Sequence, residues 1–204
     1  MGFLICIEGI DGAGKRTQAG LLRDYLLAKG RGAVVYAYPD YESRYGKIIN
    51  EFLSEKAEME VGEQFLLYLL DKESSKKRIM DDLKSGKVVI TDRYFISNIA
   101  YQVAGGFDYD AAKRIIELME LPEPDLVFYL SVPIDVSIKR KTEQKGKTDR
   151  FEGSGGYLAK VMDVYERLYA DGYGAGTWIK IDGTGSREEI STVIAAESAE
   201  ALTL

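Results

Sequence analysis

The sequence predicts one α/β domain in which a doubly wound, mostly parallel five-stranded sheet is flanked by helices. Short apolar stretches rich in β-branched or aromatic residues alternate with longer helical patterns along the whole chain. Strands that are apolar on both faces are typical of a parallel sheet covered by helices on each side. The length of 204 residues suits a single domain, 1–204, and neither a repeat nor an interdomain linker interrupts it.

The predicted elements follow a strand–helix order from end to end. Strands are expected at 3–8, 33–38, 87–91, 126–131 and 178–182. Helices are expected from about 14 to 29 and over 60–84, 95–104, 110–119, 134–141, 157–171 and 186–201. The first helix has Leu22 and Leu26 at helical spacing and stops at Gly30, because glycine is common just past a helix end. This alternation places a binding site beyond the carboxyl ends of the strands.

Composition excludes several classes of function. The net charge of −6 argues against a sequence-independent binder of nucleic acid polymers, which would carry a basic face. Cys6 is the only cysteine, so the chain forms no internal disulfide, which fits a reducing cytosol. Neither a membrane-length apolar run nor a signal peptide is present, and a cytoplasmic protein is expected. The absence of histidine excludes Ser-His triads and most zinc sites.

The segment GIDGAGKRT, residues 9–17, has the glycine and lysine spacing of a phosphate-binding loop. It follows a predicted strand and opens a predicted helix, which is the context that this motif requires. Its glycines permit a tight ring of inward-pointing N–H groups, and Lys15 would reach the β- and γ-phosphates. The loop therefore predicts an ATP or GTP site. Its predicted nucleotide-binding (ATP-binding) residues are Gly9, Ile10, Asp11, Gly12, Ala13, Gly14, Lys15, Arg16 and Thr17, with Arg140 from a later basic segment.

Arg16 stands where the motif ordinarily has a hydroxyl that reaches magnesium. One interpretation is that Arg16 adds charge near the phosphates while Thr17 offers a hydroxyl from a rotated direction. The metal then depends on carboxylates elsewhere. The alternative is a solvent-facing cation, which would be mildly unfavourable beside the positive end of the helix dipole.

A second cluster, Asp92-Arg93-Tyr94, follows the strand predicted at 87–91. A carboxylate at the carboxyl end of a strand beside a phosphate loop is the usual position of a magnesium-binding aspartate. The arginine offers a planar fork for phosphate oxygens. Alternatively, Asp92 caps the following helix and Arg93 lies on the surface.

The window KRKTEQKGKTDR, residues 139–150, holds six basic residues against two acidic ones. With Gly146 inside it, the window predicts a mobile basic lid at about 139–154 that closes over a triphosphate. A solvated run of charges is the alternative.

Taken together, these motifs resemble those of the thymidylate kinase family over nearly the whole chain. The resemblance rests on FLICIEGIDGAGKRTQ at the start, YPDY at 38–41, LLYLLDKE at 66–73, DRYFISNIAYQ at 92–102, PDLVFYL at 124–130 and DRFE at 149–152. The phosphate loop is shared by a very large superfamily. The combination of 92–102 with 38–41 and 149–152 is far more specific.

The resemblance implies phosphoryl transfer from ATP to dTMP, giving dTDP and ADP, with Mg²⁺ and in a homodimer. The catalytic residues that it implies are Lys15, Asp92, Arg93 and Arg150, with Asp92 and Asp11 at the metal. The dTMP-binding residues that it implies are Asp11, Tyr41, Arg44, Tyr68, Lys72, Arg93, Ser97, Asn98, Tyr101 and Gln102.

Individual roles follow from the same resemblance. Tyr68 matches a position that stacks on thymine, and Lys72 one beside the base carbonyl. Asn98 matches a position that bonds the base edge, and Tyr101 one that crowds the 2′ position. Lys72 stands where arginine is common, which replaces a bidentate fork by a point charge.

Two further family positions bear on the phosphates. Asp40 also replaces a frequent arginine, so Arg44 is expected to serve the acceptor phosphate instead. Gly12 matches the subgroup that lacks an arginine inside the phosphate loop and has its basic groups on the lid.

Three alternatives remain open from the residues alone. A deoxynucleoside kinase would need a carboxylate base such as Glu8 or Asp11, whereas a phosphate acceptor is mostly dianionic at neutral pH and needs none. A GTP-dependent switch would carry an N-K-x-D segment, which the sequence lacks. Another monophosphate kinase, for UMP, CMP or dUMP, is the main competing prediction.

Overall fold

The computed structural model describes residues 2–145 and 155–203 and contains a sheet of five parallel strands. The strands are β1 (Phe3–Glu8), β2 (Ala33–Ala37), β3 (Val88–Asp92), β4 (Leu126–Ser131) and β5 (Thr177–Asp182). Their order across the sheet is β2-β3-β1-β4-β5, so the first strand lies at the centre. The predicted doubly wound fold is confirmed, and the sheet is wholly parallel.

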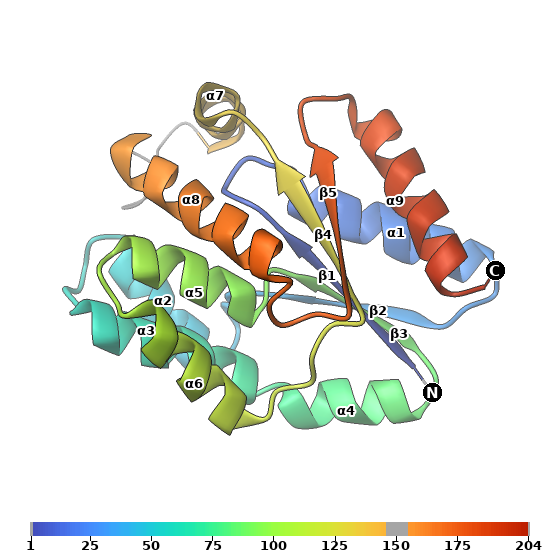
Figure 1. Cartoon of the computed structure of the whole chain (residues 1–204). Helices are drawn as coiled ribbons and strands as arrows, with labels where there is room; N and C mark the ends of the chain where they lie inside the picture. The colour runs from blue at the N-terminus through green and yellow to red at the C-terminus, as the bar shows by residue number, and fades with distance from the viewer. Residues whose placement is uncertain (1, 146–154, 204) are drawn as a thin grey trace.

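Helices cover both faces of this sheet (Figure 1). They are α1 (Lys15–Ala28), α2 (Arg44–Leu53), α3 (Val61–Glu73), α4 (Lys76–Lys84), α5 (Phe95–Ala104), α6 (Tyr109–Met119), α7 (Ile134–Lys145), α8 (Gly155–Asp171) and α9 (Arg187–Ala201). Helices α1 and α9 pack together on one face, and α5 packs against α8 and α3 on the other. Within the described ranges no helix is both long enough and apolar enough to cross a membrane.

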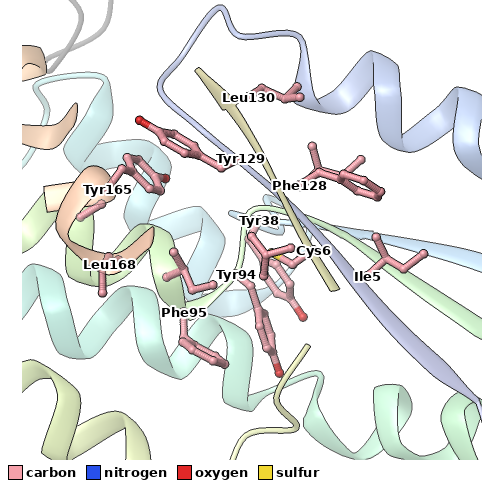
Figure 2. Packing of buried hydrophobic residues seen from close by; sticks show 14 of the residues in the cluster. Ile5, Cys6, Tyr38, Tyr94, Phe95, Phe128, Tyr129, Leu130, Tyr165 and Leu168 are labelled. Carbon is pink, nitrogen blue, oxygen red and sulfur yellow. The ribbon is translucent and has the colours of Figure 1, made fainter. Parts of the chain in front are cut away.

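The core lies on the three central strands. All five residues of β3 are buried, and Ile5, Ile7 and Phe128 of β1 and β4 are inaccessible to solvent. Figure 2 shows Tyr165 of α8 beside Tyr129 of β4, where the two rings stack with centroids 5.3 Å apart. These contacts fix α8 against the sheet close to the carboxyl ends of the strands.

The expectation that all five strands are covered on both faces is wrong for the two edge strands. Every residue of β2 is half-buried, and Thr177, Lys180 and Asp182 of β5 are exposed. The cause is their position, because a strand at the edge of a sheet has a neighbour on only one side.

The single helix expected over 60–84 is two helices, α3 and α4. At the break, the Ser75 hydroxyl donates to the Lys72 carbonyl oxygen (2.9 Å) and also bonds the Tyr38 hydroxyl, in competition with the regular helix ladder. After the break α4 packs against β3, whereas α3 packs against α2 and α5.

Two other helices differ from the sequence prediction. Helix α2 was not predicted, although Ser43 caps it by accepting from the Gly46 N–H at 2.8 Å. Helix α7 continues to Lys145, so the first residues of the expected basic loop are helical. The rest of that loop, 146–154, lies outside the described residues.

Candidate active site

The phosphate loop joins the carboxyl end of β1 to α1. Gly9, Gly12 and Gly14 all have positive φ, at 141°, 74° and 93°, a region that favours glycine. At Gly12 a side chain is also excluded by space, since an added Cβ would lie 2.5 Å from the Ser137 carbonyl oxygen of α7. The loop is therefore packed directly against the helix that leads into the basic segment.

Lys15 is the first residue of α1 and is buried. Its Nζ donates to the Ile10 carbonyl oxygen at 2.8 Å, which places the ammonium group inside the loop. Burial, reinforced by the charge of Arg93, lowers the pKa of Lys15 to about 8. In the free protein the Lys15 ammonium group therefore already lies where it could contact an anion bound by the loop.

A cavity of about 510 Å³ opens beside this loop at the carboxyl edge of the sheet. It brings together residues predicted for both substrates. Those on its wall are Asp11, Gly12, Gly14, Lys15, Arg16, Thr17, Tyr41, Tyr68, Lys72, Asp92, Arg93, Ser97, Asn98, Tyr101 and Gln102. A volume of this size suits small-molecule ligands.

Arg93 lies on the cavity wall, immediately after β3, with φ at +66°. Its Nη1 donates to the Gly9 carbonyl oxygen and to Ser97 Oγ, both at 3.1 Å. Its Nη2 contacts Asp11 Oδ1 at 2.5 Å and Tyr101 Oη at 3.1 Å. A non-glycine residue at positive φ costs roughly 1–3 kcal/mol and persists only where its surroundings hold it.

Asp11 interacts electrostatically with three basic residues around it. Burial by itself would raise its pKa, but Arg93, Lys15 and Lys141 outweigh that effect and hold the pKa well below its usual range. The Tyr101 hydroxyl also donates to Asp11 Oδ2 at 3.3 Å. The carboxylate is therefore ionised and oriented by neighbouring donors.

Asp92 ends β3 opposite Ile7 of β1, so the parallel register brings it beside the phosphate loop. Burial raises its pKa, and the charges of Lys15, Arg93 and Arg16 oppose that shift. No group of three or more carboxylate, cysteine or histidine side chains suited to a metal exists among the described residues. Mg²⁺ bound to nucleotides ordinarily uses one or two carboxylates with substrate phosphates and water, so Asp92 fits such a site.

The opposite end of the cavity is built from aromatic and amide groups. Lys72 of α3 is buried, and its Nζ lies 5.1 Å from the centroid of the Tyr38 ring and 5.6 Å from that of Tyr68. Burial lowers the pKa of Lys72 to about 8. Asn98 Nδ2 makes a long contact of 3.4 Å with the Phe65 carbonyl oxygen, and Asn98 Oδ1 has no partner in the described part of the chain. These groups make this part of the cavity wall aromatic and partly polar.

Several predicted residues lie elsewhere. Gly9, Ile10 and Ala13 belong to the phosphate loop without lining the cavity. Arg44 is exposed, and its guanidinium stacks 4.5 Å from the Tyr45 ring centroid and bonds that hydroxyl. The free structure thus does not bring Arg44 to the cavity.

The two remaining predicted arginines belong to the basic segment. Arg140 donates to the carbonyl oxygens of Gly183 and Thr184, at 2.7 and 3.3 Å, beyond the carboxyl end of β5. Arg150 lies outside the described residues.

Two residues of α7, Lys141 and Ser137, were not singled out from the sequence. Lys141 reaches the cavity from α7, with its Nζ 3.9 Å from Asp11 Oδ1, and Ser137 one helical turn earlier donates to the Asp11 carbonyl oxygen at 2.6 Å. The spacing of four residues between them was the available signal. Tyr38, Pro39 and Asp40 line the cavity beside Tyr41, within the YPDY segment already quoted.

Comparisons with known proteins identify the family of the chain. The thymidylate kinase family model matches residues 7–194. A probable thymidylate kinase of Archaeoglobus fulgidus is 39% identical over 165 residues, 79% of this chain and 80% of that protein. A thymidylate kinase of Akkermansia muciniphila is 34% identical over 192 residues, covering 93% and 88%.

Solved structures give the same answer. A thymidylate kinase from Candida albicans, whose report describes a broad substrate specificity, superposes with a TM-score of 0.80 at 25% identity. The match covers 99% of this chain and 92% of that one. With this agreement in sequence and fold, the chain belongs to the thymidylate kinase family of phosphotransferases, whose reaction is the ATP-dependent phosphorylation of dTMP.

Proposed function

We propose that this protein transfers the γ-phosphoryl group of ATP to dTMP, with ATP at the phosphate loop and dTMP in the remainder of the cavity. The observation that carries the proposal is the position of Arg93. Its guanidinium bonds both the Gly9 carbonyl oxygen of the phosphate loop and the Tyr101 hydroxyl, which lies on the same cavity wall as Tyr68 and Asn98. It therefore lies where the two substrates would meet.

The catalytic roles follow from charge and position. The acceptor phosphate is already mostly dianionic at neutral pH, so no side chain has to remove a proton from it. The protein must align two polyanions and offset charge on the transferring group. Lys15 and Arg93 supply fixed positive charge at the junction, and Lys141 adds a third cation from α7.

Asp92 is the residue that we assign to Mg²⁺. It ends β3 on the cavity wall, near Lys15 and Arg16. The ion, when bound, would neutralise charge between the β- and γ-phosphates. Asp11 fits a metal role less well because both of its oxygens already accept from Arg93 and Tyr101. We therefore give Asp11 the task of orienting Arg93 and contacting the acceptor.

Recognition of thymine is assigned to Tyr68, Lys72 and Asn98. Tyr68 can stack on the flat ring, and the buried Asn98 amide can offer both an acceptor and a donor to the carbonyl–NH–carbonyl edge. Asn98 Oδ1, which lacks a partner among the described residues, is available for the ring N–H. Cytosine reverses part of this pattern, and a mismatch of buried polar groups gives strong rejection.

The proposal is tested with a coupled ADP-release assay over a panel of nucleoside monophosphates. We expect dTMP to give the highest kcat/KM, dUMP to be weaker by about tens of fold, and dCMP and purine monophosphates to be negligible. Tyr101→Ala should admit ribonucleotides more readily than Tyr101→Phe, because the ring supplies the bulk beside the 2′ position. A higher kcat/KM with UMP or CMP than with dTMP would refute the acceptor assignment.

We also propose that the protein works in the cytoplasm as a homodimer. Two exposed leucines one turn apart on α3, Leu66 and Leu70, support an apolar contact between subunits. Light scattering on the purified protein tests the dimer, and a monomer at assay concentrations would contradict it.

A further inference from the structure

Glu8 is a buried carboxylate that none of the roles assigned above uses. It is the last residue of β1 and has no exposed surface. Its Oε1 accepts from the Tyr94 backbone N–H at 2.8 Å and faces Cys6 Sγ at 3.5 Å. Its Oε2 accepts from Ser97 Oγ at 2.5 Å and Tyr165 Oη at 2.9 Å. Buried charge of this kind persists only where donors surround it.

These donors come from segments far apart in the chain. Tyr94 immediately precedes α5 and Ser97 lies in its first turn, while Tyr165 is in α8. Helix α5 has no acidic residue in its first turn, so the Glu8 carboxylate provides the negative charge that a helix N-terminus favours. Glu8 thus joins β1, α5 and α8 at one buried point.

The proton on Ser97 connects Glu8 to Arg93. A hydroxyl has one proton to donate and lone pairs to accept with. Because Ser97 donates its proton to Glu8, its oxygen presents lone pairs to Arg93 Nη1, which donates to it at 3.1 Å. The carboxylate therefore sets Ser97 as an acceptor toward the guanidinium.

Glu8 also fixes the backbone on which Arg93 is carried. Arg93 has φ at +66°, and its own N–H donates to the Ile7 carbonyl oxygen at 3.0 Å. The next N–H, that of Tyr94, is the one that Glu8 accepts. The peptide groups on both sides of the strained residue are thus tied to the end of β1.

We propose that Glu8 is a positioning residue for phosphoryl transfer, which acts by holding the Arg93 guanidinium through Ser97 and through the Tyr94 peptide. The inference rests on the proposed role of Arg93 at the junction of the two substrates. Glu8 touches neither substrate, and its effect on the reaction passes through Arg93.

Glu8→Gln is the informative change because it keeps the shape of the side chain. The glutamine oxygen can accept from only one of the two sets of donors, and its NH₂ group then faces the other set. If the NH₂ group faces Ser97, it donates to Ser97 Oγ and competes with Arg93 Nη1 for the lone pairs of that oxygen, while the Ser97 proton turns to Tyr165 Oη at 2.9 Å. If it faces the Tyr94 N–H instead, the peptide that fixes Arg93 loses its acceptor.

The test is a double-mutant cycle of Glu8→Gln with Arg93→Lys, measured as kcat and as KM for dTMP. Lysine keeps the positive charge at position 93 but lacks the planar fork of donors that fixes the orientation of the arginine side chain. In the wild-type background we expect Glu8→Gln to lower kcat/KM by about 10- to 100-fold. In the Arg93→Lys background we expect the same change to lower it by less than about 3-fold.

Equal factors in both backgrounds would show that Glu8 acts independently of Arg93 and would overturn the inference. Asp71→Asn is the matched control, because Asp71 is also a fully buried carboxylate but accepts from the Asp40 N–H and Ser43 Oγ instead. Its effect should multiply with that of Arg93→Lys. A coupling equal to that of Glu8 would mean that any buried carboxylate gives the result, which would also overturn the inference.

Two further outcomes are distinguishable. Wild-type kcat/KM for Arg93→Lys would refute the proposed role of Arg93 and this inference with it. If Glu8→Gln does not fold, Tyr165→Phe carries the test, since it removes one hydroxyl that donates to Glu8. We expect Tyr165→Phe to lower kcat/KM several-fold only when Arg93 is present, and equal losses in both backgrounds would overturn the proposal.

Discussion

Lys72→Met should stabilise the free protein while weakening its interaction with dTMP. Lys72 is 2% exposed, and its Nζ donates to the Tyr68 carbonyl oxygen at 3.2 Å while lying over two tyrosine rings. Burial lowers its pKa from the ordinary 10.5 to about 8. Each pKa unit corresponds to about 1.4 kcal/mol, so the charged amine destabilises the free protein by about 3 kcal/mol at neutral pH.

The pH dependence gives this prediction its sign. Below pH 8 the lysine is charged in both folded and unfolded protein, and the full penalty applies. Between pH 8 and about 10.5 only the unfolded protein keeps the proton, so the stability of the wild-type protein rises with pH. The advantage of Lys72→Met should therefore be largest at pH 7 and vanish by about pH 10.5.

Differential scanning calorimetry at pH 7 and at pH 10 measures the effect. For a chain of this length, about 3 kcal/mol corresponds to an increase in Tm of roughly 6–12 °C at pH 7. Lys77→Met is the matched control, because the Lys77 side chain is 88% exposed and its ion pair with Asp81 is on the surface. The control should change Tm very little. An unchanged or lower Tm for Lys72→Met at pH 7, or a gain at pH 10 as large as the gain at pH 7, would refute the reasoning.

Three further predictions concern the phosphates. Lys15→Ala should reduce kcat by about 10²- to 10³-fold without lowering Tm, and a variant that keeps more than about a tenth of wild-type kcat contradicts this assignment. The kcat/KM for ATP should fall as pH rises through about 8, where the free enzyme loses the Lys15 proton, whereas a flat profile to pH 9.5 would exclude that titration. In a magnesium titration, Asp92→Asn should raise the Mg²⁺ requirement. Arg16→Ser should lower turnover and leave the Mg²⁺ requirement unchanged. A wild-type Mg²⁺ requirement for Asp92→Asn would contradict this division of roles.

The sequence by itself determined the parallel α/β fold and the proximity of two segments to which we assign the phosphates. Loop 9–17 and the cluster at Asp92 and Arg93 each follow a buried strand directly. Since carboxyl ends of parallel strands lie at one edge, the two segments had to be near each other, and the Ile7–Asp92 register confirms it. Each segment is recognised from residues that are neighbours in the chain, so the sequence alone shows it.

Only the tertiary structure decided how side chains from separate elements point. The hydroxyl contacts of Ser75 lie at the break between α3 and α4, which no periodicity in 60–84 indicated. Arg44 turns to the neighbouring Tyr45 ring and away from the cavity, whereas Lys141 reaches Asp11 because α7 packs against Gly12. The Glu8 network is likewise a product of packing, since its donors are between 2 and 157 residues away in the chain. Contacts of that kind depend on which strands become neighbours and which helices cover them, and the residues carry no local pattern that encodes this.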